Sequence, residues 1–137
     1  MEVRERHEGD VIIIRPVGRI DATTTQAFSD HVKQRIVDGA RKVVLDLYHI
    51  DFMSSAGLRM LNILKAVMKS YKGEIVICSP SDNLMELFQL VSLGNIYHIF
   101  HTVEAALKKL LDDAYYHLPR NSDMILESRI TLPTNEY

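Results

Sequence analysis

This sequence has only one cysteine, no strong excess of either charge, and no long apolar run. Because Cys78 is alone, the chain can form no internal disulfide, and its place in the apolar run IVICS predicts a buried, unreactive thiol. The net charge of -2 argues against a surface for nucleic acid or membranes. The charged start, MEVRERHEGD, lacks the apolar core of a secretory signal, and no apolar run approaches membrane-spanning length. We therefore expect one cytoplasmic domain with no membrane insertion and no direct contact with nucleic acid.

The sequence also lacks the motifs that carry catalysis or bind cofactors. It contains no G-x-x-x-x-G-K-[ST] or G-x-G-x-x-G segment, so no phosphate-binding loop is predicted. The segment DFMSSAG lacks the first glycine of the G-x-S-x-G nucleophile elbow. His98 and His101 are three residues apart at a predicted strand end, where they would point to opposite faces. We expect no cofactor, no metal site and no enzymatic activity.

What the sequence does contain is a regular alternation of strand and helix patterns. Apolar or alternating runs predict strands at residues 3–7, 11–17, 42–47, 74–78 and 96–100, the first two as a hairpin. Helical patterns lie at residues 23–37 and 55–71, after a cap at Ser81 or Asp82, and after a cap at Thr102. Gly39 and Gly73 stand where helix C-caps belong. These patterns predict an α/β fold with a mixed, mostly parallel sheet of about five strands, an N-terminal hairpin and about four helices.

Two adjacent serines stand where an apolar run becomes a helical pattern, in the segment DLYHIDFMSSAGL. A helical projection at about 100° per residue places Ser55 in the middle of the polar side and Ser54 at the margin of the buried side. Ser54 is therefore predicted to cap the helix, and Ser55 to be the more exposed hydroxyl. Leu58 also falls on the polar side, near Arg59 and Asn62, so it is either a contact residue or an ordinary surface leucine, unless tertiary packing buries it.

Three blocks of the chain resemble the STAS domain family, and specifically the bacterial anti-anti-sigma factors, also called anti-sigma factor antagonists. The blocks are VGRIDATTTQAF, VVLDLYHIDFMSSAGLRML and LMELFQLVSLGNIYHIFHTVEAAL, and the resemblance spans about residues 3–112. It implies a STAS domain at residues 1–117 followed by an extended tail at 118–137. For the tail, the sequence leaves disorder, a contact with a partner and an added edge strand open.

The resemblance implies a phosphorylation switch without catalysis of its own. A protein of this kind, when unphosphorylated, binds an anti-sigma factor that is also a serine kinase, and the kinase then releases its target. Phosphorylation inactivates the protein, and a metal-dependent serine phosphatase restores it. The family motif places the phosphate on Ser55, with Ser54 as the alternative. With the helical projection, it predicts a partner-binding set of Asp21, Ser54, Ser55, Leu58, Arg59 and Asn62.

Two other functions stay open at this point. One is a STAS scaffold or regulatory subunit of a transporter or a stress-sensing complex, in which the serine is only structural. The other is an enzyme, which the missing catalytic motifs disfavour. An acceptor serine at position 55 favours the phosphorylation switch, whose final target need not be a sigma factor.

Overall fold

The computed structural model describes residues 1–115, which form six strands, four α-helices and one 3-10 helix. The strands are β1 (Glu2–Glu8), β2 (Val11–Ile20), β3 (Lys42–Asp46), β4 (Ile50–Met53), β5 (Glu74–Cys78) and β6 (Ile99–Phe100). The helices are α1 (Thr25–Val37), α2 (Ser55–Ser70), α3 (Asp82–Leu90), the 3-10 helix η1 (Leu93–Asn95) and α4 (Val103–Tyr115). No helix in this part of the chain is long and apolar enough to cross a membrane. The predicted tail at 118–137 lies outside the described residues.

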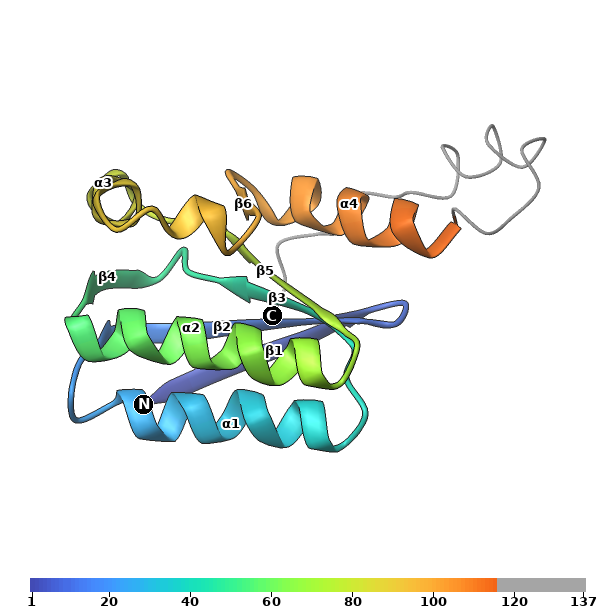
Figure 1. The fold of residues 1–137 in the computed structure, drawn as a ribbon, viewed down its shortest axis with the longest axis horizontal. Helices are drawn as coiled ribbons and strands as arrows, with labels where there is room; N and C mark the ends of the chain where they lie inside the picture. The colour runs from blue at the N-terminus through green and yellow to red at the C-terminus, as the bar shows by residue number, and fades with distance from the viewer. Residues whose placement is uncertain (116–137) are drawn as a thin grey trace.

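The strands form one mixed sheet in the order β1-β2-β3-β5-β6, and β4 pairs with the far end of β2 (Figure 1). Only the β1–β2 hairpin is antiparallel among the described pairs. This arrangement confirms the predicted α/β fold. The strand that the sequence did not predict is β4, because its four residues, IDFM, are too few and too mixed in polarity to show a strand period.

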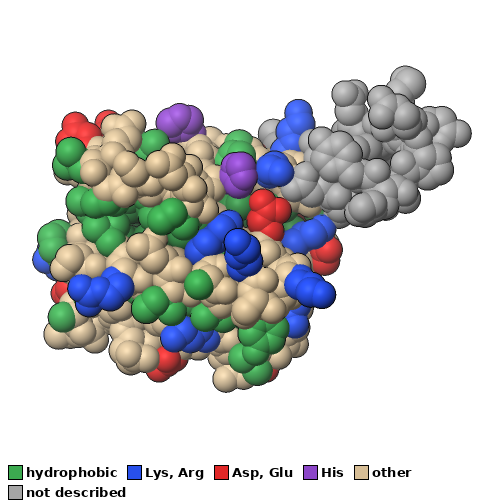
Figure 2. Space-filling model, viewed as in Figure 1, with side chains coloured by type: hydrophobic (Ala, Val, Ile, Leu, Met, Phe, Trp, Pro, Cys, Tyr) green, Lys and Arg blue, Asp and Glu red, His purple; other side chains and the backbone are tan. Residues whose placement is uncertain are grey.

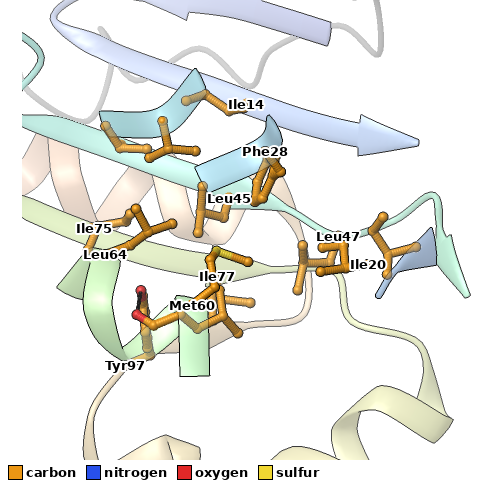
Figure 3. Packing of buried hydrophobic residues seen from close by; sticks show 14 of the residues in the cluster. Ile14, Ile20, Phe28, Leu45, Leu47, Met60, Leu64, Ile75, Ile77 and Tyr97 are labelled. Atoms are coloured by element: carbon orange, nitrogen blue, oxygen red, sulfur yellow. Dashed lines mark hydrogen bonds between the residues drawn. The ribbon is translucent and has the colours of Figure 1, made fainter. Parts of the chain in front are cut away.

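The central strands are buried on both faces, which explains why their sequences are almost continuously apolar. In β2, Ile12 and Ile14 point into the larger core, against α1, α2 and α3, whereas Val11 and Ile13 point into a smaller core under α4. Figure 3 shows the larger core, where Ile14, Leu45 and Ile77 of the sheet meet side chains of the covering helices. Helices α1 and α2 therefore lie together on one face of the sheet, and α4 lies on the other (Figure 1).

The helix caps follow the sequence with one difference. Gly39, with a φ of 120°, follows α1 as predicted. After α2, however, the left-handed residue is Lys72, with a φ of 62°, and Gly73 has another role. A Cβ at Gly73 would lie only 2.7 Å from the carbonyl oxygen of Arg41, so the glycine permits close packing against the chain before β3.

The caps of α3 and α4 are those that the sequence predicted. The Ser81 hydroxyl accepts a hydrogen bond from the Leu84 N–H at 3.2 Å, which selects Ser81 over Asp82. The Thr102 hydroxyl accepts one from the Ala105 N–H at 3.1 Å. Both contacts satisfy N–H groups that have no partner within their own helix.

A buried ion pair lies between β2 and β3. Asp46 is fully buried, and its Oδ2 accepts a hydrogen bond from Nε of Arg15 at 2.8 Å and forms an ion pair with Nη2 of the same side chain, also at 2.8 Å. Its other oxygen accepts the N–H of Tyr48 at 3.1 Å. Cys78 pairs in register with Asp46, and burial together with this nearby carboxylate raises the pKa of its thiol. Cys78 is thus the buried thiol that the sequence predicted.

Candidate functional site

The site begins where two neighbouring parallel strands end. Ile20 is the last residue of β2 and Met53 the last of β4, and they are paired in register. The N–H of Ser54 donates to the carbonyl of Ile20 at 2.9 Å, which extends the pairing by one residue. Asp21 and Ser54 therefore leave the sheet side by side, each just before a helix. The carboxyl ends of parallel strands are where open α/β sheets commonly bind their ligands.

The two serines differ in exposure, as the helical projection predicts. Ser54 is the N-cap of α2, with an extended backbone, and its hydroxyl accepts a hydrogen bond from the Gly57 N–H at 3.4 Å. Ser54 is partly buried, whereas Ser55, the first residue of the helix, is exposed. Within the described part of the chain, no hydrogen bond reaches the Ser55 hydroxyl. Ser55 is therefore the hydroxyl that a second protein can reach.

Gly57 sets how closely α2 approaches the strand ends. A Cβ at this position would lie 2.6 Å from Cγ of Met53 and 2.8 Å from Cγ2 of Ile20, well inside van der Waals contact. Both neighbours are buried in the core. The missing side chain thus allows the first turn of α2, which carries Ser55, to rest directly on β2 and β4.

Asp21 shapes the turn that leads into α1. Its Oδ1 accepts hydrogen bonds from the hydroxyl of Thr23 at 2.7 Å, the N–H of Thr23 at 2.9 Å and the N–H of Thr24 at 3.2 Å. These bonds, those from Thr23 first, lower the pKa of the Asp21 carboxyl because they favour its charged form. The second oxygen lies 3.9 Å from Nε of Arg19. Asp21 therefore has a structural role at the site, whatever it contributes to binding.

Leu58 falls on the polar side of the helical projection, but its side chain is partly buried and packs against the larger core, which is the alternative of burial by tertiary packing. The projection treated α2 as having one buried side, but the helix has neighbours on both flanks. On the flank away from α1, the Tyr97 hydroxyl donates to the carbonyl of Leu61, one turn from Leu58, at 2.5 Å. On the α1 flank, Ile63 falls on the apolar side of the helical projection and yet is 45% exposed. Packing has therefore shifted the apolar stripe of α2 toward Tyr97.

Two residues that the sequence did not single out flank the serines. Arg19 and Phe52 are paired in register at the ends of β2 and β4, and the guanidinium lies 4.2 Å from the centre of the Phe52 ring. Phe52 is 39% exposed and Arg19 is also exposed. Such a pair offers a cationic and aromatic contact surface next to Ser54. The signal was hidden in the sequence, because it depends on the strand β4 that was not predicted.

A groove of about 290 Å³ runs between α1 and α2, beginning near Ser55. Its walls come from Ala22 before α1, from Lys33 and other residues of α1, and from Arg59, Met60 and Ile63 of α2. Arg59 and Asn62 are exposed, as the projection predicts. The residues of the predicted partner-binding set therefore lie at the strand ends and along the first two turns of α2, with Leu58 as a partly covered member.

The site offers an exposed hydroxyl at the start of a helix. Within residues 1–115, no group of three His, Cys, Asp or Glu side chains could hold a metal ion. Ser55 is at the start of α2, where the first N–H groups have no partner within the helix and the helix dipole favours negative charge. An anion attached to Ser55 would meet these groups.

Comparison with known proteins identifies the family of the chain. The model of the STAS domain matches residues 2–106. A Bordetella bronchiseptica protein named as an anti-sigma factor antagonist, BtrV, is 28% identical over 89 residues, which are 65% of this chain and 77% of the relative.

Two solved structures share the fold. One is a Thermotoga maritima protein named as an anti-sigma factor antagonist, with a TM-score of 0.75, 20% identity, and coverage of 78% of this chain and 92% of that one. The other is SpoIIAA from Bacillus in its phosphorylated form, with a TM-score of 0.63, 19% identity, and coverage of 80% and 99%. Because the family model covers most of the sequence, this chain belongs to the STAS domain family.

Proposed function

We propose that this protein is an anti-sigma factor antagonist that acts as a phosphorylation-controlled binding module and not as an enzyme. Unmodified, it binds a cytoplasmic anti-sigma factor that is also a serine kinase, and the kinase releases the protein that it otherwise holds. Phosphorylation of Ser55 by this kinase ends the binding. A metal-dependent serine phosphatase restores the binding form.

The observation that carries this proposal is the difference between the two serines. The Ser54 hydroxyl caps α2 by accepting a hydrogen bond, whereas Ser55 presents an exposed hydroxyl at the first position of the same helix. A kinase can therefore modify Ser55 without disturbing the cap. The names of the relatives support the same class of function, and SpoIIAA is a protein of this fold with a phosphorylated form.

The effect of phosphorylation follows from charge. A phosphate on Ser55 adds about -1.5 to -2 charges at neutral pH to a surface that the unmodified protein would place against its partner. The free N–H groups at the start of α2 can bind such an anion, so we expect no conformational change of the fold on phosphorylation. A switch of about tenfold in affinity needs only about 1.4 kcal/mol.

The test is to incubate the protein with ATP and the candidate kinases encoded near its gene, and to locate the phosphate by mass spectrometry. We expect one phosphate on Ser55. Binding to the same kinase is then measured for the wild type, Ser55→Ala and Ser55→Asp. We expect Ser55→Ala to bind and to resist phosphorylation, and Ser55→Asp to bind more weakly.

Ser70→Ala is a matched control, because Ser70 is also an exposed serine of α2, at the opposite end of the helix. It should behave as the wild type in both assays. Phosphate on Ser54, or full kinase binding by Ser55→Asp, would contradict the assignment of Ser55. A protein that no kinase binds or phosphorylates would instead favour a scaffold role for this STAS domain.

A further inference from the structure

The groove between α1 and α2 is lined by one cation from each helix, Lys33 of α1 and Arg59 of α2. Helix α2 contains no aspartate or glutamate, and its Lys65 lies on the other flank, 5.5 Å from the centre of the Tyr97 ring. Figure 2 shows this face of the molecule, where Lys and Arg side chains are spread over α1 and α2 with few acidic ones between them. Of the residues that line the groove, Arg59 and Lys33 are cations and none is acidic. A partner that binds here therefore meets a positive surface.

The groove is also partly apolar. Met60 and Ile63 of α2 line it, and Ile63 is 45% exposed although it is a large aliphatic side chain. The two helices run in the same direction beside each other, so the groove leads away from the starts of both helices (Figure 1). A segment that fits this surface has an apolar side chain for the groove and carboxylates for its cationic rim.

Arg59 connects this groove with Ser55. The two residues are four apart in α2, a spacing that brings side chains together on the helix surface, with Cβ atoms about 5–6 Å apart. Both are exposed, and within the described part of the chain Arg59 forms no ion pair. A guanidinium can bind either a phosphate or a carboxylate, because its two parallel N–H donors match the spacing of the oxygens in both groups.

We infer that Arg59 has two alternative ligands: a carboxylate of an acidic partner segment in the groove, when Ser55 is unmodified, and the phosphate of Ser55 when it is modified. The inference rests on the proposed function for the partner, but the phosphate contact is a property of this chain alone. Phosphorylation then acts twice. It repels the carboxylates of the partner, and it occupies the cation that they would bind.

The phosphate contact is tested on protein with phosphoserine genetically encoded at position 55, so no kinase is needed. The second pKa of the phosphate, ordinarily about 6, is measured by ³¹P NMR. Arg59 favours the doubly charged form, so Arg59→Gln should raise this pKa by about half a pH unit. The charged groups of the neighbouring strand ends, which are Asp21, Arg19 and Asp51, are unchanged in the variant. Lys69→Gln, an exposed cation far along α2, should leave the pKa unchanged.

The groove is tested with the kinase that binds the wild type. Arg59→Gln and Lys33→Gln should each weaken its binding to the unmodified protein, and Lys69→Gln should not. Phosphoserine at position 55 should reduce binding by a smaller factor in Arg59→Gln than in the wild type, by about threefold or more, because the two changes remove the same contact.

The outcomes separate the two proposals. An equal phosphate pKa in the wild type and Arg59→Gln refutes the contact with phosphate, and full binding by both cation variants refutes the acidic segment. Either result leaves phosphorylation of Ser55 standing. If no kinase binds the wild type, the proposed function fails and the role of the groove with it, whereas the ³¹P titration still decides the contact between Arg59 and the phosphate.

Discussion

Replacing Gly57 by alanine should improve the helix propensity of α2 but disturb its packing against the strand ends. Taken alone, α2 would gain about 1 kcal/mol, because alanine is the better helix former. The added Cβ, however, would lie 2.6 Å from Cγ of Met53 and 2.8 Å from Cγ2 of Ile20, where carbon atoms normally lie about 3.5–4.0 Å apart. Met53 is 4% exposed and Ile20 is fully buried, so neither can move into solvent.

Overpacking of this kind costs about 1–3 kcal/mol, so it should outweigh the gain in helix propensity. We expect Gly57→Ala to lower the free energy of unfolding by about 1 kcal/mol, measured by urea denaturation with circular dichroism. Amide NMR shifts should change at Ser54 and Ser55, because α2 must move away from the strand ends.

Gly94→Ala is the matched control, since a Cβ there would meet no atom within 4 Å. Its stability should stay within about 0.5 kcal/mol of the wild type. If Gly57→Ala is as stable as the wild type, and the amide shifts at the serines do not move, close packing does not position the site and the reasoning is refuted.

Two further predictions concern the carboxylates of the fold. Asp46→Asn removes the buried charge of the pair with Arg15, whose side chain is only 12% exposed. We expect a loss of about 3 kcal/mol in urea denaturation, and a loss below about 1 kcal/mol would show that the pair is not needed. For Asp21, the hydrogen bonds from Thr23 lower the pKa of the carboxyl in the folded state. The carboxylate therefore stabilises the fold above the unfolded pKa of about 3.9, and this contribution is lost as the pH falls through the lower folded pKa. The Thr23 amide resonance should therefore titrate with a midpoint below about 3.9, and a midpoint at or above that value would contradict the role of Asp21 in the turn.

The fold could be predicted because its strands and helices carry strong local patterns. β2, β3 and β5 are buried on both faces, and this demand makes them almost continuously apolar in the sequence. The caps Ser81 and Thr102 were also predictable, since a cap depends on residues within one turn. Features that depend on tertiary contacts were not predictable from local patterns, such as the close packing of Gly73 against Arg41.

The site was predictable only where it depends on one helix. The exposure of Ser55 and the cap at Ser54 follow from the periodicity of α2 alone. The burial of Leu58 depends on the segment that carries Tyr97, nearly forty residues further along the chain, so no projection of α2 could reveal it. Likewise, Arg19 and Phe52 become neighbours only through the pairing of β2 with β4.

The short strand β4 therefore matters more to the site than its length suggests. β3 pairs with β2 only from Ile12 to Ile14. β4 pairs with the last three residues of β2, further along the strand. This second pairing places the start of α2 beside the start of α1. Without β4, no strand would pair with the end of β2 and hold the start of α2 beside Asp21. The two helix starts that flank the groove would then not be fixed relative to each other. A four-residue strand thus turns two helix starts into one binding surface.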